Sequence, residues 1–254
     1  MAITKDEAYR HVLCMDLQPD KLRFAALSKT DRSITDLQEI ELTAFDRESI
    51  AALMTDEKLS FDYDGFVLTA GGKRNTLIPV DLFNHAKPAE VFSLNYPEPF
   101  DNLDYNRIPE VGIVNIYELP LWIKSLFVIK FPRVRIVHPV TVLLKGIFDQ
   151  SIWPKKMHLY LEKEIFYLFI TEKNKMIYFN QFDFNNLADM VYHLLFVLEQ
   201  KEIPQDEIAL HLYGVGKNWE PLDELQTFFA KPIQLDVKKE KGEHFILSQQ
   251  LLCV

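Results

Sequence analysis

Apolar and polar residues follow one pattern along this chain, and the pattern occurs twice. In the second half, three successive runs are typical of strands: Met157 to Glu162, Ile165 to Thr171 and Met176 to Asp183. A helix, a strand, a helix and a strand follow them. The first half opens in the same way, with the runs His11 to Asp16, Leu22 to Ser28 and Ile34 to Thr43. The sequence therefore predicts an α/β chain with mixed sheets, built from two copies of one unit.

The later elements of the second copy have clear boundaries. Asn185 or Asn186 can cap a helix, because a short amide side chain accepts from the first free backbone N–H groups. The helix then carries a broad apolar stripe, made of Leu187, Met190, Val191, Leu194, Leu195 and Leu198. After Pro204 the pattern predicts a strand, a short helix and a last strand, at Ile208 to Tyr213, Pro221 to Phe229 and Ile233 to Val237.

The first copy is interrupted after its fourth strand. Asp46 caps a predicted helix from Glu48 to Asp56, and Gly65 to Thr69 is the next strand. Beyond it the order no longer matches, and we predict a small α+β insertion at about 75–138. Its expected parts are a strand at Thr76 to Pro79, helices at Val80 to Ala86 and Ala89 to Leu94, an acidic loop from Pro97 to Leu103, a strand at Val111 to Tyr117, a helix opened by Pro120 and a strand at Arg133 to Val137. Pro139 opens the next helix.

The best domain boundary is Ser151 to Lys156, where a proline and two lysines interrupt the apolar pattern. We therefore expect a first domain over residues 1–153, with the insertion, and a second over 154–254.

Charge and composition exclude several classes of protein. The formal net charge of −9 is spread over both halves, so neither half is basic and we expect no nucleic-acid partner. The first ten residues lack the apolar core of a signal peptide, and no apolar run approaches the ~20 residues that span a bilayer. We expect a soluble, cytoplasmic protein with no membrane span. Cys14 and Cys253 fit neither a metal spacing nor a disulfide framework.

The strand and helix order resembles a known architecture. Three strands, a helix, a strand, a helix and a strand is the order of a ribonuclease-H-like domain, and two such domains with an insertion in the first make an actin-like ATPase. The stretch Asn115 to Ile147 resembles the one that leads back from the insertion in the PilM type of pilus assembly protein and in the cell-division protein FtsA. The whole chain is similar to an uncharacterised bacterial family, a domain of unknown function seen mostly in Bacteroidetes. The stretches that carry this likeness are Thr76 to Pro79 with Leu82 and Phe83, Phe131 and Pro132 with His138, and Phe179 to Phe182.

The resemblance implies where a nucleotide would bind, and the residues there are altered. Actin-like ATPases hold phosphates between two turns that carry Asp-x-Gly and small hydroxyl residues. The first turn here is Asp16-Leu17-Gln18-Pro19, which keeps the aspartate, lacks the glycine and loses one amide donor at Pro19. The second is Glu162-Lys163-Glu164, whose two carboxylates would repel phosphate, an effect that Lys163 offsets in part.

Two glycine-rich turns invite comparison with nucleotide sites. Gly214-Val215-Gly216 lies between a predicted strand and a helix, where the family's adenine-side glycine pair is expected, although a tight turn explains it more simply. Gly71-Gly72-Lys73 lacks the other residues of a phosphate loop. The candidate ligand-binding residues of the cleft between the domains are Asp16, Gln18, Glu162, Lys163, Gly214 and Gly216.

No catalytic or metal-binding set stands out. A nuclease would need converging carboxylates, for which Asp16, Glu48 and Asp64 are the available residues of the first domain. His138, just before Pro139, fits a helix cap or a packed ring better than a base. We therefore predict no catalytic residue and no metal site.

Two functions remain open. The first is a binding or scaffolding module without nucleotide hydrolysis or cofactor, which binds a protein partner. The second is an ATPase-like protein that holds ATP and magnesium between its domains. Aromatic residues on both faces of the second sheet favour the first, because some of them must face an insertion, the other domain or a partner. They are Phe166, Tyr167, Phe169, Tyr178, Phe179, Phe182 and Phe184.

Overall fold

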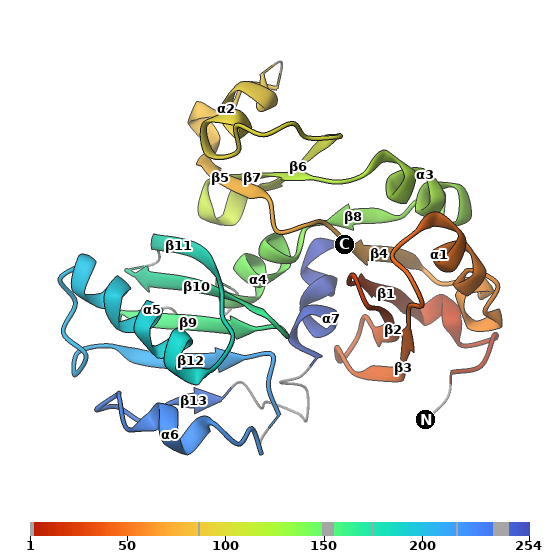
Figure 1. Cartoon of the computed structure of the whole chain (residues 1–254). Coiled ribbons are helices and arrows are strands. Elements are labelled where there is room, and N and C mark those ends of the chain that lie inside the picture. Colours follow the sequence, from red (N-terminus) through yellow and green to blue (C-terminus); the bar gives the residue numbers. More distant parts are fainter. Residues whose placement is uncertain (1–2, 86, 149–154, 174, 217, 236–243) are drawn as a thin grey trace. The chain divides into compact units, whose positions relative to one another are not determined.

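The computed structural model describes residues 3–85, 87–148, 155–173, 175–216, 218–235 and 244–254. The chain forms two compact units (Figure 1). Unit 1 comprises Met1–Gly146 with Ile246–Val254, and unit 2 comprises Ile147–Phe245. Among the described residues, no helix combines the length and the apolar character needed to cross a bilayer.

Unit 1 is built on a five-stranded mixed sheet of order β3-β2-β1-β4-β8. Its strands are β1 (His11–Leu17), β2 (Lys21–Ser28), β3 (Ile34–Glu41), β4 (Gly65–Thr69) and β8 (Arg135–Val137). The first three form antiparallel hairpins, and β4 and β8 add in parallel to β1. Strands β1 and β2 are buried on both faces, which explains their nearly continuous apolar sequences.

Unit 2 repeats this sheet. Its order is β11-β10-β9-β12-β13, with the same strand directions in the same places. The strands are β9 (Lys156–Leu161), β10 (Ile165–Glu172), β11 (Lys175–Asp183), β12 (Ala209–Tyr213) and β13 (Gln234–Leu235). The duplication predicted from the apolar pattern is therefore confirmed.

One helix follows the third strand in each copy. These are α1 (Arg47–Leu53) and α5 (Leu187–Gln200). Both begin at caps foreseen in the sequence: Asp46 accepts a hydrogen bond from the Ser49 N–H at 2.8 Å, and Asn186 accepts one from the Asp189 N–H at 3.0 Å. The apolar face of α5 packs on the unit 2 sheet through Met190, Val191, Leu194, Val197 and Leu198. The shorter helix α6 (Leu222–Gln226) precedes β13.

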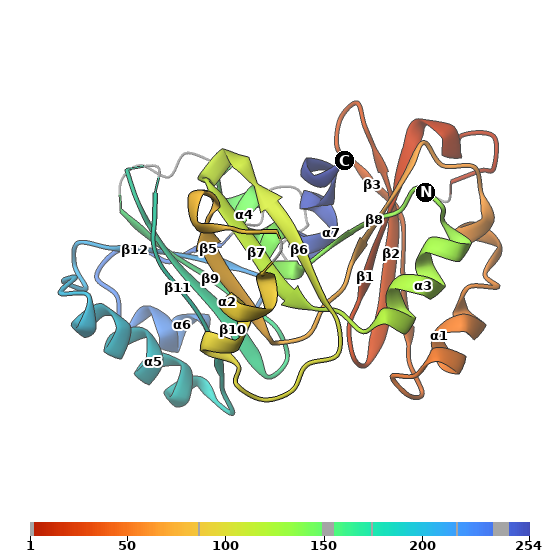
Figure 2. The same cartoon turned by 90° about the horizontal axis from the view of Figure 1, so that it is seen from above.

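The inserted part of unit 1 is a separate three-stranded antiparallel sheet of order β5-β7-β6 (Figure 2). Its strands are β5 (Asn75–Pro79), β6 (Leu103–Ile108) and β7 (Ile113–Glu118), and helix α2 (Pro88–Asn95) accompanies them. Of the helix predicted from Val80 to Ala86, the described residues 80–85 contain a 3₁₀ turn, Val80–Leu82, and no α-helix. Strand β6 was not predicted, because the polar residues Asp104, Asn106 and Arg107 interrupt the alternation of apolar and polar residues that is typical of a strand.

The insertion is shorter than the pattern predicts. Helix α3 (Leu121–Lys130) buries Ile123 and Phe127 in the core below the five-stranded sheet, and β8 pairs with β4 in that sheet. Both elements thus belong to the duplicated core, and the inserted sheet ends with β7. The following helix is α4 (Pro139–Phe148), as Pro139 indicates.

The end of the chain also differs from the domain limits drawn from the sequence. The second domain was expected to run to residue 254, whereas Ile246–Val254 packs with unit 1. Within this stretch lie most of α7 (Phe245–Gln249) and a 3₁₀ turn, Gln250–Cys253. Gln250 is fully buried and donates from Nε2 to the Met15 carbonyl at 2.7 Å and to Thr69 Oγ1 at 2.6 Å. Most of the expected boundary, residues 151–154, lies outside the described residues.

Candidate functional site

Asp16, the residue that would arrange magnesium in an active relative, is engaged by a neighbouring strand. The residue is 2% exposed and pairs with Arg23 in the β1–β2 register. Arg23 donates to Asp16 Oδ2 from Nη2 at 2.5 Å and from Nε at 3.2 Å, and Gln18 Nε2 donates to the same oxygen at 3.0 Å. The carboxylate charge is therefore balanced inside the protein.

The backbone of the first turn is also occupied. The Gln18 N–H donates to the Lys21 carbonyl at 2.9 Å and closes the hairpin, and Pro19 has no N–H. A phosphate cradle needs several successive amides that point outward. Neither of these two positions can supply one.

The second turn has the same geometry with different residues. The Glu162 N–H donates to the Ile165 carbonyl at 2.9 Å, so the Glu162 turn closes as the Gln18 turn does. Lys163 and Glu164 are exposed, and Glu162 is half-buried. The second turn therefore lacks glycine and hydroxyl residues, and its first amide donates within the hairpin and not to a ligand.

The strand registers align the two copies residue by residue. Asp16 pairs with Arg23 on one side and with Thr69 on the other. The residue in the same place of unit 2 is Tyr160, which pairs with Tyr167 and Tyr213. Glu162 therefore corresponds to Gln18 and not to Asp16. The acidic position of unit 1 is aromatic in unit 2.

The aromatic residues of this position form a packed cluster in unit 2. The Tyr160 ring lies 6.1 Å from that of Tyr167 and 6.4 Å from that of Phe245, and the rings of Tyr213 and Phe245 are 4.5 Å apart. Tyr160 is 2% exposed. In place of the Asp16 carboxylate, the second copy thus has the phenol of a buried tyrosine.

Gly214 lies beside the second turn because β9 and β12 are parallel. Its φ of +82° is left-handed, and a Cβ added there would lie 2.4 Å from the Leu161 carbonyl oxygen. Strand packing thus requires glycine without any ligand. The Gly216 carbonyl accepts from the Trp219 N–H at 3.2 Å and belongs to the turn toward α6.

The six predicted site residues therefore form two groups, one in each unit. Asp16 and Gln18 share a hydrogen bond in unit 1. Glu162, Lys163, Gly214 and Gly216 lie at the same end of two adjacent parallel strands in unit 2.

His138 caps a helix, as its position before Pro139 indicates. Its Nδ1 accepts from the Val140 N–H at 3.2 Å, and its Nε2 donates to the Gly72 carbonyl at 2.9 Å. Complete burial lowers the pKa of His138 to about 4, so the ring is neutral. Gly71 packs against this ring, since a Cβ there would lie 2.3 Å from His138 Cδ2.

The carboxylates considered for a nuclease do not assemble. Glu48 is exposed in the first turn of α1, and exposed Asp64 pairs with Lys29 at 2.5 Å. Within the described ranges, no group of three or more His, Cys, Asp or Glu side chains is arranged to hold a metal ion.

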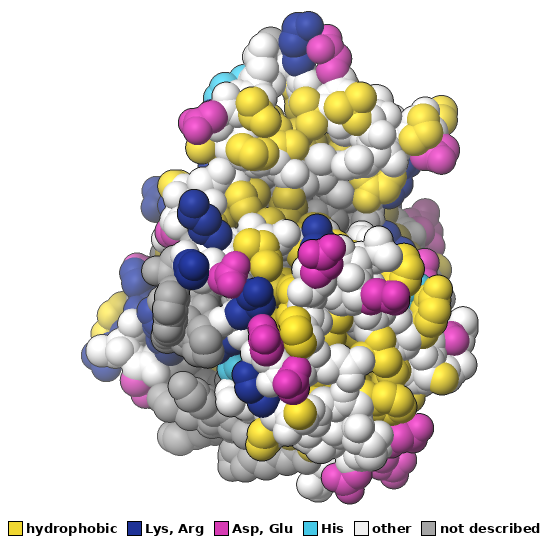
Figure 3. Space-filling view, turned by 90° about the vertical axis from the view of Figure 1, so that its left-hand side faces the viewer, with side chains coloured by type: hydrophobic (Ala, Val, Ile, Leu, Met, Phe, Trp, Pro, Cys, Tyr) yellow, Lys and Arg dark blue, Asp and Glu magenta, His cyan; other side chains and the backbone are white. Residues whose placement is uncertain are grey.

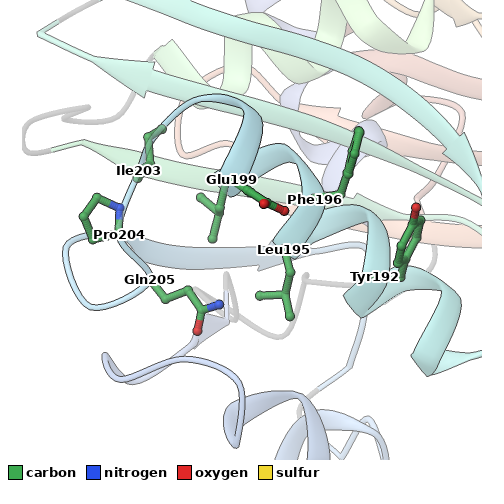
Figure 4. A pocket seen from close by; sticks show the side chains of 8 residues that line it. Tyr192, Leu195, Phe196, Glu199, Ile203, Pro204 and Gln205 are labelled. Carbon is green, nitrogen blue, oxygen red and sulfur yellow. The ribbon is translucent and has the colours of Figure 1, made fainter.

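Sequence reasoning missed two features. The first is the role of Arg23. Its signal in the sequence is that it is a charged residue within the otherwise apolar run Leu22 to Ser28. The second is a groove of about 580 Å³ on unit 2, beside the C-terminal half of α5 (Figure 4). Two exposed aromatic residues four positions apart, Tyr192 and Phe196, are its signal in the sequence.

Solved structures of known proteins share this fold. A protein from Bacteroides thetaiotaomicron, described as having an actin-like ATPase fold and unknown function, matches with a TM-score of 0.86 and 21% identity over 100% of both chains. The PilM-PilN type IV pilus biogenesis complex matches with a TM-score of 0.56 and 14% identity, over 95% of this chain and 97% of the other. Ethanolamine utilization protein EutJ from Carboxydothermus hydrogenoformans matches with a TM-score of 0.50 and 6% identity, over 94% and 89%. The chain thus has the actin-like ATPase fold.

Within this fold class the sequence itself defines the family. Residues 2–231 match the family described as "Protein of unknown function (DUF3822)", and the chain belongs to it. This confirms the expected membership of an uncharacterised family. Among curated proteins, none matches.

Proposed function

We propose that this chain is a non-catalytic binding or scaffolding module that has lost nucleotide hydrolysis and whose ligand is another protein. The observation that carries the proposal is the state of the magnesium-arranging position in the two copies. In unit 1 it holds Asp16, paired with Arg23, and in unit 2 it holds Tyr160 within an aromatic cluster. Neither position offers a free carboxylate to a metal ion.

The likeness to PilM supports the second part of the proposal. That protein shares the fold, and its structure is of a complex with PilN in type IV pilus biogenesis. An actin-like chain can therefore serve as a partner-binding protein. The alternative, a protein that binds ATP and magnesium, would need Gly214 and Gly216 to contact the nucleotide. The close approach of Gly214 to the Leu161 carbonyl already explains the first of these glycines.

Calorimetric titration of the nucleotide-free, full-length protein tests the proposal. We expect no saturable heat and no thermal shift with magnesium ATP or magnesium ADP. A ligand at 100 times its Kd would raise stability by roughly 2.7 kcal/mol, which corresponds to about 5–10 °C in Tm. Binding would therefore be easily detected.

A matched variant assigns any binding that is seen. Asp16→Asn with Arg23→Gln removes both charges of the buried pair together, so that no unpaired charge is left behind. Saturable, micromolar binding of magnesium ATP that this double variant abolishes would refute the proposal and restore the nucleotide-binding alternative.

A further inference from the structure

We propose that the groove beside α5 binds a short segment of a partner protein that carries apolar side chains flanked by lysine or arginine. This inference rests on the proposed binding function and gives it a site. Figure 4 shows Tyr192, Leu195, Phe196 and Glu199 projecting from the helix, with Ile203 and Pro204 on the connection that follows.

Two of the residues that line the groove are exposed aromatic residues. Tyr192 is 64% exposed and Phe196 is 45% exposed, although the opposite face of the same helix is fully buried. Their rings stack with centroids 6.0 Å apart and an angle of 18° between the planes. An aliphatic side chain or a guanidinium can pack against exposed aromatic rings of this kind. Hydrophobic side chains are visible on the side of the protein that Figure 3 shows, with acidic and basic groups among them.

One acidic residue, Glu199, lines the groove, and three more, Glu202, Asp206 and Glu207, follow it within eight residues along the chain, next to the lining residues Ile203 to Gln205. All four side chains are exposed, and in the part of the chain that the structure describes none of them forms an ion pair. Four neighbouring carboxylates without partners favour a cationic ligand.

Among the described residues, two basic side chains lie close to these four acidic residues along the chain or by contact, so the acidic ones are in excess. Lys201 lies over the Tyr178 ring at 5.2 Å, and Lys231 donates to the Glu207 backbone carbonyl at 2.6 Å. The helix itself adds to the negative potential, because the groove lies at its C-terminal end and its last turn contains no basic residue. The negative charge of Glu199 in that turn interacts unfavourably with the helix dipole, and a bound lysine or arginine would offset this repulsion.

The same charges disfavour a second copy of this chain as the occupant. With a net charge of −9, two copies repel each other, whereas a basic segment is attracted. The proposed occupant is therefore a segment of a different protein.

Selection from a library of random short peptides displayed on phage, with the full-length protein as bait, tests the proposal. We expect enriched peptides in which lysine or arginine flanks leucine, isoleucine or an aromatic residue. Phe196→Ser and Tyr192→Ser should each weaken binding of a labelled enriched peptide about tenfold or more in fluorescence anisotropy. Glu199→Lys should weaken it too and should reduce its salt dependence.

Leu94→Ser is the matched control, because Leu94 is 82% exposed on unit 1, away from α5 in the sequence. It should leave the affinity unchanged, and thermal melts check that each variant is folded. Enrichment of acidic peptides, no enrichment at all, or equal affinity for Phe196→Ser and the wild type would each overturn the proposal. So would a concentration-dependent dimer in sedimentation that Phe196→Ser abolishes, since the occupant would then be a second copy. None of these results depends on the nucleotide titration, so this site can fail while the proposed function stands.

Discussion

The buried pair of Asp16 and Arg23 allows a quantitative test of its role. The two side chains are 3% and 8% exposed and meet at 2.5 and 3.2 Å. At 3.2 Å and an effective dielectric constant of about 20, their attraction is about 5 kcal/mol. Removing one partner leaves the other buried and unpaired, which costs about 3–5 kcal/mol. Asp16→Leu and Arg23→Met should therefore each destabilise the protein by about that amount.

The double variant separates pairing from packing. In Asp16→Leu with Arg23→Met both charges are gone and the volume is roughly kept, so the free energy of unfolding should lie close to that of the wild type. Lys29 and Asp64 provide a control, because this ion pair is 52% and 43% exposed. Asp64→Ala should cost less than about 1 kcal/mol.

Urea unfolding followed by tryptophan fluorescence measures these differences. Trp122 is the only one of the three tryptophans in unit 1, so replacing Trp153 and Trp219 by phenylalanine makes it the reporter of that unit. The reasoning fails if Asp16→Leu costs no more than Asp64→Ala. Arg23 would then be reached by water, and the carboxylate of Asp16 would be open to a metal ion.

Three further predictions concern the turns and caps. Burial lowers the pKa of His138 from 6.5 to about 4, so the unfolded chain takes up the proton first. The stability that depends on the neutral ring should be complete above about pH 6.5 and be lost as the pH falls toward about 4. In this pH range, His138→Gln should reduce the slope of the unfolding free energy against pH by the equivalent of up to one proton. An unchanged slope would contradict this. Gly71→Ala should cost about 2–4 kcal/mol, because φ is +142° and the new Cβ meets the His138 ring. Gly72→Ala should cost much less, because a Cβ there has nothing within 4 Å. Equal losses of stability in urea titrations would show that the His138 ring can move aside. Asn186→Ala should cost about 1 kcal/mol by loss of the α5 cap and Asn186→Ser close to none, and a serine variant as unstable as the alanine one would contradict the capping role.

Local signals predicted most of the core elements. Apolar runs bounded by Pro, Asp and Gly located the strands of both sheets, and β4 has the predicted bounds, Gly65–Thr69. Caps located α1 and α5. What the sequence did not show depends on contacts far apart in the chain. The return of the C-terminus to unit 1 rests on a hydrogen bond from Gln250 to a carbonyl 235 residues earlier, and no periodicity encodes such a contact.

For the candidate site, the sequence alone did not show the strand register. Both turns lack the glycine of a phosphate-binding turn, but the second turn was compared with Asp16, whereas its first residue, Glu162, corresponds to Gln18. Locating the loop of each hairpin before comparing the two copies would have corrected this. In an antiparallel hairpin, residues equally distant from the loop face each other, so a loop of Gln18 to Lys21 puts Arg23 opposite Asp16.

The same rule gives a way to interpret other chains of this fold. A strand-end aspartate can arrange magnesium only if the residue opposite it on the next strand leaves its oxygens free. An arginine in that place donates to the carboxylate directly, as Arg23 does here at two positions of its guanidinium. Loss of the aspartate would then leave a buried cation, so a structural role is enough to explain its presence. In chains of this fold, the residue opposite the aspartate is therefore more informative about hydrolysis than the aspartate itself.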